Sequence, residues 1–354
     1  MIRVVVAEDS LTVRELLVEI LESDPEIRVV GQAKNGAEAV ELATRLKPDL
    51  VTMDVHMPVM DGFEATKEIM VRAPAPIVLV SSSASREDVD LSFDAMRAGA
   101  LMVVAKPDSP QSAVFDGRRQ QFLAMVKAMS QVKVVRRWAP RTQVVTPPVG
   151  LRRAPGARLR LVAIAASTGG PAALQRILAD LPRDFPAPIL VVQHIATGFV
   201  AGLADWLSAS CNLRVEVAEH GEPLLERSVF LAPDDRHLGV TADARVIVAD
   251  APPVNGFRPS GTYLFESAAR AYGGSVAAVI LTGMGSDGVE GLKAVKAAGG
   301  VVLAQDEASS VVYGMPREAV EAGVVDAMLS IGEVGARLTN LVAGGNDAHT
   351  HPGR

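Results

Sequence analysis

Residues 159–171 read Leu-Arg-Leu-Val-Ala-Ile-Ala-Ala-Ser-Thr-Gly-Gly-Pro. A near-continuous apolar run of this length is typical of a strand that is buried on both faces of a parallel sheet. The Gly-Gly-Pro that follows predicts the start of a helix, because the glycines let the backbone turn closely and Pro171 fits a first helical turn. A strand, a turn and a helix together form the repeating unit of an α/β domain.

The same unit recurs on both sides of this stretch. Short β-branched runs alternate there with segments whose apolar residues recur every three to four positions, which is helical spacing. The expected strands cover residues 2–7, 29–31, 50–53, 77–80, 101–104, 159–165, 188–192, 228–231, 246–248, 276–281 and 301–303, and the clearest helices cover 11–22 and 36–46. This alternation predicts an α/β protein with two doubly wound domains, the first built on a five-stranded parallel sheet.

The domain boundaries follow from where this alternation stops. Residues 1–107 form the first domain, and its last helix is expected to continue over 115–135. Residues 136–158 contain four prolines and few large apolar residues, a composition typical of an extended linker, which here is basic. The second domain then covers 159–342. The tail, 343–354, lacks any periodicity and is expected to be disordered.

The formal net charge of −6 is unevenly distributed along the chain. Residues 108–160 carry eleven Lys and Arg against two Asp, a net charge of +9, which leaves −15 on the remainder. One alternative is therefore a DNA-binding regulator, because Lys and Arg bind phosphate backbones. The prolines that interrupt these arginines, and the lack of a two-helix pattern, argue against a helix-turn-helix module. We expect no nucleic-acid partner.

Cysteine content and hydropathy narrow the class further. Cys211 is the one cysteine in the sequence, which excludes an intramolecular disulfide framework. No apolar run reaches the roughly 18 residues that a membrane-spanning helix needs. We therefore expect a soluble, cytoplasmic and monomeric protein with no direct membrane insertion.

Charged and hydroxyl side chains follow the strands of the first domain. Glu8 and Asp9 come after the first strand, Asp54 after the third, Ser81 after the fourth and Lys106 after the fifth. Ligands bind at this edge of an open parallel sheet. Three carboxylates there repel one another unless a cation joins them, and oxygen ligands favour Mg²⁺. Lys106 and Ser81 suit the oxygens of a phosphoryl group on Asp54.

Residues 1–107 resemble a response-regulator receiver domain. The motifs that carry the resemblance are Glu8-Asp9-Ser10, Asn35-Gly36, Met53-Asp54-Val55-His56-Met57-Pro58 with Asp61-Gly62, and Lys106-Pro107. The resemblance implies that Asp54 takes phosphate from a partner histidine kinase. It also implies that Mg²⁺ is held by Glu8, Asp9, Asp54 and the backbone carbonyl of His56, and that the Lys106–Pro107 bond is cis. Val103 stands where many receivers carry an aromatic residue.

Three strand ends in the second domain carry the residue types of a serine hydrolase. Ser167 follows the first strand, His194 the second, and Asp287 lies in the loop after residues 276–281. A serine hydroxyl needs a base to take its proton, and the base needs a third group to orient it. His220 and His237 also lie near expected strands, so the pattern alone leaves the choice of base open.

Residues 159–335 resemble the catalytic domain of the CheB family, the chemotaxis protein-glutamate methylesterases. The motifs are Ser167-Thr168-Gly169-Gly170-Pro171, Gln193-His194, Ala232–Leu238, Arg258-Pro259-Ser260, Leu281–Gly288, Gln305-Asp306-Glu307 and Val312–Pro316. The resemblance implies that Ser167 is the nucleophile, His194 the base and Asp287 its orienting group. It further implies that Thr168 supports His194 and that the Met284 N–H donates to the oxyanion, which makes His237 structural.

The resemblance also implies an activity and its partners. The family demethylates glutamate methyl esters on chemoreceptor cytoplasmic domains and deamidates receptor glutamines, with no cofactor for the ester reaction. The partners implied are a chemotaxis-type histidine kinase as phosphodonor and methylated chemoreceptors as substrates. A phosphate-accepting domain is here fused to a hydrolase. We therefore hypothesise that the unphosphorylated receiver covers the Ser167 cleft and that phosphorylation of Asp54 loosens the interface between the two domains. Gly261 and Thr262 depart from the family's usual Val-Asp.

A nicotinamide-dependent enzyme is the second alternative. Residues Gly283–Gly288 match G-x-G-x-x-G after an apolar strand, and Asp306 follows at the distance of a ribose-binding acid. However, Asp287 would put a carboxylate into a turn that has to attract a pyrophosphate. The chain after residue 306 is also too short to complete a nucleotide-binding sheet.

Overall fold

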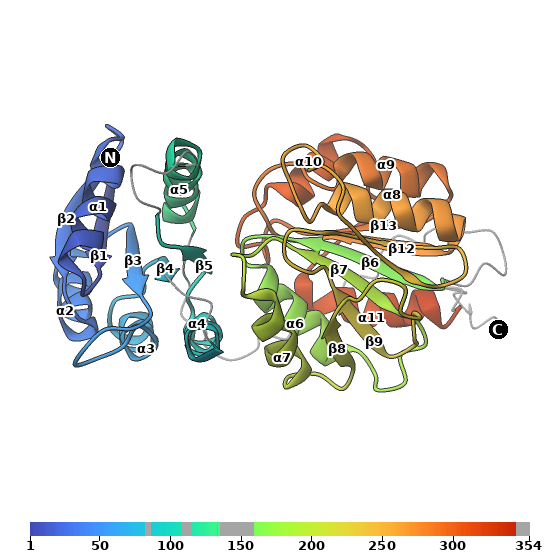
Figure 1. Cartoon of the computed structure of the whole chain (residues 1–354), viewed down its shortest axis with the longest axis horizontal. Helices are drawn as coiled ribbons and strands as arrows, with labels where there is room; N and C mark the ends of the chain where they lie inside the picture. Colours follow the sequence, from blue (N-terminus) through green and yellow to red (C-terminus); the bar gives the residue numbers. More distant parts are fainter. Residues whose placement is uncertain (82–85, 108–114, 133, 135–158, 345–354) are drawn as a thin grey trace, which may run out of the picture. The chain divides into compact units, whose positions relative to one another are not determined.

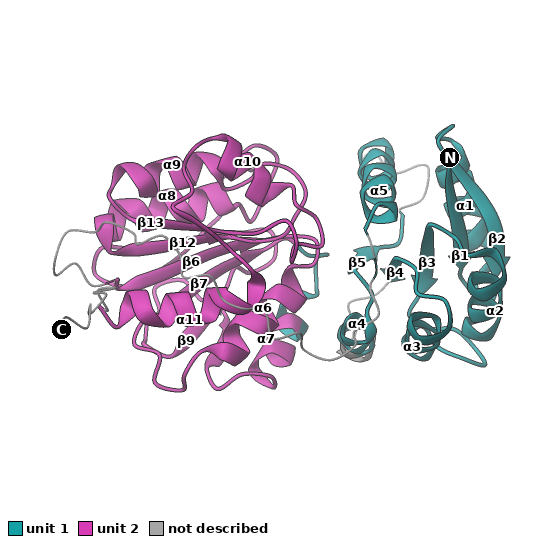
Figure 2. Cartoon of the chain, turned by 180° about the vertical axis from the view of Figure 1, so that it is seen from behind, with its two compact units in different colours: residues 1–141, 195–202 teal, residues 142–194, 203–354 magenta. Residues whose placement is uncertain are grey.

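The computed structural model describes residues 1–81, 86–107, 115–132, 134 and 159–344. It divides into two compact units, residues 1–141 with 195–202 and residues 142–194 with 203–354 (Figure 2). The expected linker over 136–158 and nearly all of the expected tail, from 345 onward, lie outside the described residues. Among the described residues, no helix combines the length and the apolar composition needed to cross a membrane.

The first unit is a five-stranded parallel sheet in the order β2-β1-β3-β4-β5 (Figure 1). Its strands are β1 (Ile2–Ala7), β2 (Ile27–Ala33), β3 (Leu50–Asp54), β4 (Ile77–Ser81) and β5 (Met102–Ala105). Its helices are α1 (Leu11–Glu22), α2 (Gly36–Leu46), α3 (Gly62–Arg72), α4 (Arg86–Ala98) and α5 (Phe115–Ser130). Side-chain caps fix where two of these helices begin, since Asn35 accepts from the Glu38 N–H and Asp61 from the Glu64 N–H. The predicted five-stranded parallel sheet is confirmed.

The second unit is built on a seven-stranded parallel sheet in the order β14-β13-β12-β6-β7-β9-β8. These strands are β6 (Leu161–Ala166), β7 (Ile189–Gln193), β8 (Arg214–Val217), β9 (Ser228–Leu231), β12 (Val276–Ile280), β13 (Val301–Gln305) and β14 (Ala327–Leu329). The helices after residue 159 are α6 (Gly170–Asp180), α7 (Val200–Ser208), α8 (Gly261–Tyr272), α9 (Val289–Ala297), α10 (Met315–Glu321) and α11 (Ile331–Val342), with a 3₁₀ turn, η1, at Gly273–Ser275. Helices α8, α9 and α10 cover one face of the sheet, and α6 and α11 cover the other (Figure 1).

One expected strand belongs elsewhere. Residues 246–248 lie in β11 (Val246–Ala249), which pairs antiparallel with β10 (His237–Val240) in a separate two-stranded sheet. The connection between them, residues 241–245, is too short for the crossover of a dozen or more residues that a parallel pair requires. A hairpin is therefore the pairing that this connection permits.

The strand order reverses at β6. The chain passes from β6 to β7 on one side, and later returns to place β12 on the other side of β6. Loops that leave the carboxyl ends of such neighbouring strands in opposite directions open a crevice where α/β proteins bind ligands. The loops after β6, β7 and β12 are those that carry Ser167, His194 and Asp287.

Candidate active site

The carboxylates of the first unit converge as the strand ends predicted. One ligand oxygen each from Glu8, Asp9 and Asp54 lies within 4.8 Å of the others. The Lys106 ammonium lies 2.8 Å from Glu8 Oε2 and 2.8 Å from Asp54 Oδ2. Burial, together with the nearby Asp54 charge, raises the pKa of Glu8 to about 7 against the lowering effect of Lys106. A set of oxygen ligands only, with one cation already paired to it, suits a hard ion such as Mg²⁺.

The other receiver residues lie at the same edge of the sheet, with one correction. Ser81 is buried at the end of β4, and its carbonyl accepts a hydrogen bond from the Lys106 N–H at 2.8 Å. His56 is exposed in the loop after β3. The expected cis Lys106–Pro107 bond is wrong, because Arg258–Pro259 is the cis bond that the structure records in the described residues. A trans X–Pro bond is the more stable form, and Lys106 reaches both carboxylates with it.

Three backbone contacts bring the second candidate site together. Strands β6 and β7 pair with Ala166 opposite Gln193, and the His194 N–H donates to the Ala166 carbonyl at 2.9 Å. On the other side, the Ser167 N–H donates to the Thr282 carbonyl at 3.0 Å. Ser167 and His194 therefore leave adjacent strands at the same level.

The His194 imidazole has a defined orientation. Its Nε2 lies 3.0 Å from Asp287 Oδ2, so Nε2 carries the proton that Asp287 accepts. The remaining nitrogen, Nδ1, is buried and has no hydrogen-bond partner in the described part of the chain. The side chain is 15% exposed, so little water competes for Nδ1. Nδ1 is thus the nitrogen available to take a proton. A bond from the Ser167 hydroxyl is not formed here, as is common before substrate binds.

The Asp287 carboxylate lies against the N-terminus of α8. It accepts hydrogen bonds from Ser260 Oγ at 2.7 Å, the Gly261 N–H at 2.6 Å and the Thr262 N–H at 3.2 Å. Burial raises the pKa of this carboxyl, but the hydrogen bond and charge of His194, with the bonds from Ser260 and Gly261, lower the pKa of Asp287 overall. The carboxylate therefore remains ionised and holds the imidazole in one tautomer.

The loop after β12 closes the site on its third side. A Cβ built on Gly283 would lie 2.6 Å from Ser167 Cβ and 2.4 Å from Met315 Sδ, so this backbone packs directly against the candidate nucleophile. The next residue, Met284, has a side chain that is 42% exposed. Thr168 is buried, and its carbonyl accepts a hydrogen bond from Thr282 Oγ1 at 2.9 Å.

Sequence reasoning missed Gln193 as a functional residue. The buried side chain donates from Nε2 to the carbonyls of both Ser167 and His194, at 2.8 Å each. It thus joins the backbone of the candidate nucleophile to that of the candidate base. The available signals were its place in the Gln193-His194 motif and at the end of the strand that leads into His194.

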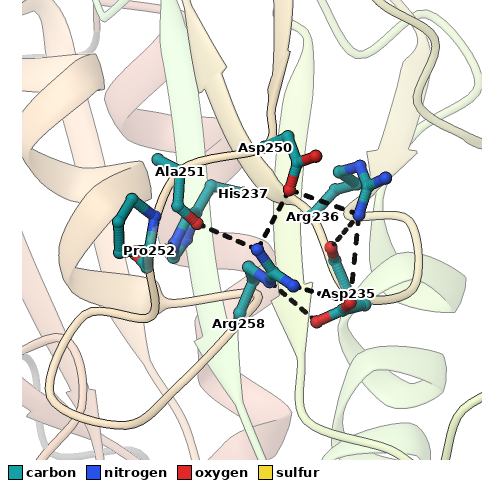
Figure 3. A network of polar contacts seen from close by, with 7 residues as sticks. All are labelled: Asp235, Arg236, His237, Asp250, Ala251, Pro252 and Arg258. Atoms are coloured by element: carbon teal, nitrogen blue, oxygen red, sulfur yellow. Dashed lines mark hydrogen bonds and ion pairs between the residues drawn. The ribbon is translucent and has the colours of Figure 1, made fainter.

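His237 is held in a separate cluster. It is fully buried in β10, its Nε2 lies 3.0 Å from the Pro252 carbonyl, and its ring stacks on Tyr263 with centroids 4.6 Å apart. Figure 3 shows it beside the ion pairs of Arg258, without a dashed contact to them. These contacts favour a structural role for His237.

The dinucleotide pattern is also accounted for by these contacts. The Gly288 N–H, at the start of α9, donates to Thr262 Oγ1 at 2.9 Å, and Asp287 lies in the turn itself. Asp306 accepts from the N–H and the hydroxyl of Ser309. The Gly288 N–H and the carboxylates of Asp287 and Asp306 are thus engaged within the chain, which disfavours a nicotinamide cofactor.

The sequence profile described as CheB methylesterase matches residues 162–338, and that of the response regulator receiver domain matches residues 4–114. A protein of Myxococcus xanthus (strain DK1622), called protein-glutamate methylesterase/protein-glutamine glutaminase 4, is 54% identical over 97% of this chain and 98% of its own length. The chain belongs to the CheB methylesterase family.

Other CheB relatives agree in both length and fold. Protein-glutamate methylesterase/protein-glutamine glutaminase 3 of Anaeromyxobacter dehalogenans (strain 2CP-C) is 53% identical over 96% of this chain and 98% of its own length. The crystal structure of the Thermotoga maritima CheB methylesterase catalytic domain superposes with a TM-score of 0.51. The two sequences are 41% identical, and the match covers 52% of this chain and 99% of the Thermotoga maritima domain. The similarity to CheB proteins therefore includes both units.

Gly261 and Thr262, which depart from the family's usual Val-Asp, both make close contacts at the start of α8. A Cβ on Gly261 would lie 2.8 Å from Ala165 Cβ and 3.4 Å from Asp287 Oδ2. A valine here would require its neighbours to move. Thr262 supplies the oxygen that caps the Gly288 N–H. Both residues also donate their backbone N–H groups to Asp287.

Proposed function

We propose that this chain is a phosphorylation-regulated serine hydrolase that removes methyl groups from glutamate esters on chemoreceptor cytoplasmic domains. The observation that carries the proposal is the orientation of His194. Its Nε2 is paired with the buried Asp287, its Nδ1 has no hydrogen-bond partner among the described residues, and His194 and Ser167 follow directly on the paired strands β7 and β6. The names of the relatives supply the ester of a protein glutamate as the substrate class.

The reaction begins with proton transfer from the Ser167 hydroxyl to His194 Nδ1. Ser167 Oγ attacks the ester carbonyl, and the tetrahedral intermediate collapses as His194 returns the proton to the departing methanol. Water then loses a proton to the same Nδ1 and cleaves the acyl-enzyme, which releases a free glutamate and regenerates Ser167. Asp287 stays ionised and stabilises the imidazolium in both halves.

The developing oxyanion requires backbone donors. The Met284 N–H follows Gly283, whose backbone packs against Ser167, and Met284 makes no backbone hydrogen bond within the residues described. We assign it as an oxyanion donor, a kind of group whose removal typically costs about 10²–10³ in rate. Thr168, buried beside the nucleophile, supports the arrangement of His194. The same steps convert a glutamine side chain with ammonia as the leaving group, in line with the second activity in the relatives' names.

The first unit is the regulatory half. We propose that Asp54 accepts phosphate from a chemotaxis-type histidine kinase, and that Lys106 and Ser81 hold the phosphoryl oxygens. Glu8, Asp9 and Asp54, with the His56 carbonyl, are the residues that would hold Mg²⁺. When bound, the ion supplies positive charge that offsets the phosphate and the carboxylates. The expected effect of phosphorylation is a faster esterase.

Methanol release from a methylated chemoreceptor fragment tests the activity. Ser167→Ala should lower the rate by several orders of magnitude, as losses within a triad do. Ser286→Ala is the matched control, since Ser286 is an exposed serine in the β12–α9 loop, and it should keep nearly full activity. Near-normal methanol release by Ser167→Ala would overturn the assignment of the nucleophile.

The regulation has its own test. Acetyl phosphate with Mg²⁺ should raise methanol release by the wild-type chain and leave that of Asp54→Asn unchanged. An equal response in both would show that Asp54 is not the phosphate acceptor. Removal of residues 1–150 should also raise the basal rate, and an unchanged rate would count against inhibition by the receiver.

A further inference from the structure

An aromatic side chain that the mechanism does not use lies on the candidate base. The Phe257 ring stacks on the His194 imidazole, with centroids 4.7 Å apart and planes 11° from parallel. It comes from the loop between β11 and α8, residues 250–260, which we call the β11–α8 loop. A Cβ on Gly285 would lie 3.9 Å from Phe257 Cζ, so the ring also approaches the loop that carries the oxyanion donor.

Local backbone geometry places this ring. The Val254 N–H donates to the Phe257 carbonyl and the Phe257 N–H donates to the Val254 carbonyl, both at 3.0 Å. Between them, Asn255 has a φ of 51° and Gly256 a φ of 85°. Two consecutive residues with positive φ, occupied by Asn-Gly, are the signature of a tight type I′ turn. Phe257 therefore leaves a closed hairpin tip rather than an open loop.

The residue after Phe257 fixes the base of this tip. Arg258 donates two bonds of 2.7 Å to the carboxylate of Asp235, and further bonds to Asp250 at 3.0 Å and to the Ala251 carbonyl at 3.2 Å (Figure 3). A paired guanidinium–carboxylate contact of this kind is geometrically specific. Arg258 thus connects the loop before β10, the end of β11 and the start of α8.

The β11–α8 loop therefore contacts the base–acid pair at two points. Phe257 covers one face of the His194 ring, and Ser260, at the end of the same loop, donates to the carboxylate that holds Nε2. Because the loop is fixed by Arg258 between these two points, the ring and the carboxylate keep their relative positions.

We propose that Phe257 is a positioning residue for His194. Its ring keeps the imidazole in the plane that directs Nε2 to Asp287 and Nδ1 toward Ser167, and its π-face stabilises the imidazolium that forms when the serine is deprotonated. This proposal rests on the proposed role of His194 as the base, and it needs no contact between Phe257 and the substrate.

Three variants separate this role from a structural one. Phe257→Leu keeps the apolar volume and removes the ring, Phe257→Tyr keeps the ring, and Tyr263→Leu removes the equivalent stack from His237 away from the site. Two substrates are used with the full chain, p-nitrophenyl acetate and a methylated chemoreceptor fragment. The first substrate reports on the nucleophile and base without receptor recognition.

The expected result is a fall in kcat of about tenfold for Phe257→Leu on both substrates, with KM unchanged. Phe257→Tyr should remain within twofold of wild type, and Tyr263→Leu should keep the wild-type kcat. In the NMR spectrum, the His194 ring protons should lose their ring-current shift in Phe257→Leu and retain it in Phe257→Tyr. A general loss of stability would explain neither the normal kcat of Phe257→Tyr nor the loss of the ring-current shift in Phe257→Leu alone.

Several outcomes would overturn the proposal. A kcat for Phe257→Leu within twofold of wild type would remove it, and so would equal losses in the Leu and Tyr variants. A change confined to KM for the receptor fragment would make Phe257 a substrate contact instead. Failure of the proposed function has a different signature, because the wild-type chain would then cleave p-nitrophenyl acetate and release no methanol from the receptor.

Discussion

Replacing Gln193 by methionine tests how the nucleophile and the base are kept in register. The substitution removes two hydrogen bonds of 2.8 Å and keeps the length of the side chain. The Ser167 carbonyl retains its bond from the Gly170 N–H, also at 2.8 Å, whereas the His194 carbonyl loses its partner. Two lost bonds, one of which leaves an acceptor unpaired, lower the free energy of unfolding by about 2–4 kcal/mol.

The effect on catalysis is separable from this loss of stability. A displacement of either residue by a fraction of an ångström to 1 Å is enough to lower kcat about 10- to 100-fold. Ser267→Ala is the matched control. Its hydroxyl also makes two bonds to one backbone segment, accepting from the Val240 N–H and donating to the Val240 carbonyl, remote from the site. It should lose comparable stability and keep its kcat.

Urea unfolding and methanol release together decide the matter. Trp206 is buried in α7 and reports on the unfolding of the second unit when Trp138 is replaced by Phe. Both variants should unfold at lower urea concentration, and only Gln193→Met should lose kcat. If Gln193→Met kept a kcat within twofold of wild type while folded, the idea that Gln193 aligns the two residues would be refuted.

Two further predictions concern close packing and charge. Gly283→Ala should lower kcat at least tenfold with little change in KM, because the new methyl group would lie 2.6 Å from Ser167 Cβ. Steady-state kinetics on the receptor fragment measures this effect, and an unchanged kcat would show that the loop moves freely to make room. Lys106→Met should destabilise the first unit, because it leaves the carboxylates of Glu8 and Asp54 without their cation. In thermal melts, millimolar Mg²⁺ should raise the stability of this variant more than that of the wild type. Equal responses to Mg²⁺ in the two proteins would contradict this explanation.

The central strands were predictable because they are buried on both faces. The strands expected over residues 159–165 and 276–281 overlap β6 and β12, at the middle of the larger sheet. Strands β8 and β14 were not expected. They are the two edges of that sheet, and an edge strand needs no continuous apolar run, so Arg214-Val-Glu-Val and Ala327-Met-Leu gave no clear signal.

The candidate site was predictable to the extent that it lies on strand ends. The carboxyl ends of parallel strands share one edge, so Ser167, His194 and Asp287 could be grouped before any coordinates were known. The choice among histidines was not settled by that rule, because His237 also belongs to a strand. Only the packed structure shows that His237 is engaged by the Pro252 carbonyl and Tyr263.

The residues that support the site could not be predicted from the periodicity of the sequence. Phe257 lies at a hairpin tip, where an aromatic residue has no periodicity to mark its face. It contacts His194 from beside Arg258, whose ion pairs to Asp235 and Asp250 join segments that are separate in the sequence. Contacts of this kind arise from tertiary geometry, which single-sequence periodicity does not encode.

The glycines of residues 283–288 show why a G-x-G-x-x-G pattern can occur in a site that binds no dinucleotide. In a dinucleotide site such glycines bring the backbone close to a pyrophosphate. Here two of them make room for protein, since Gly283 packs on Ser167 and a Cβ on Gly288 would lie 3.0 Å from the ring of Phe265, whereas Gly285 adopts a φ of 89°. The acid within the motif faces donors that no phosphate could share. Both kinds of site require glycines where the backbone has a close neighbour, so the spacing of the glycines alone does not identify that neighbour. The negative charge of Asp287, which lies between the glycines, shows that the neighbour is not a pyrophosphate.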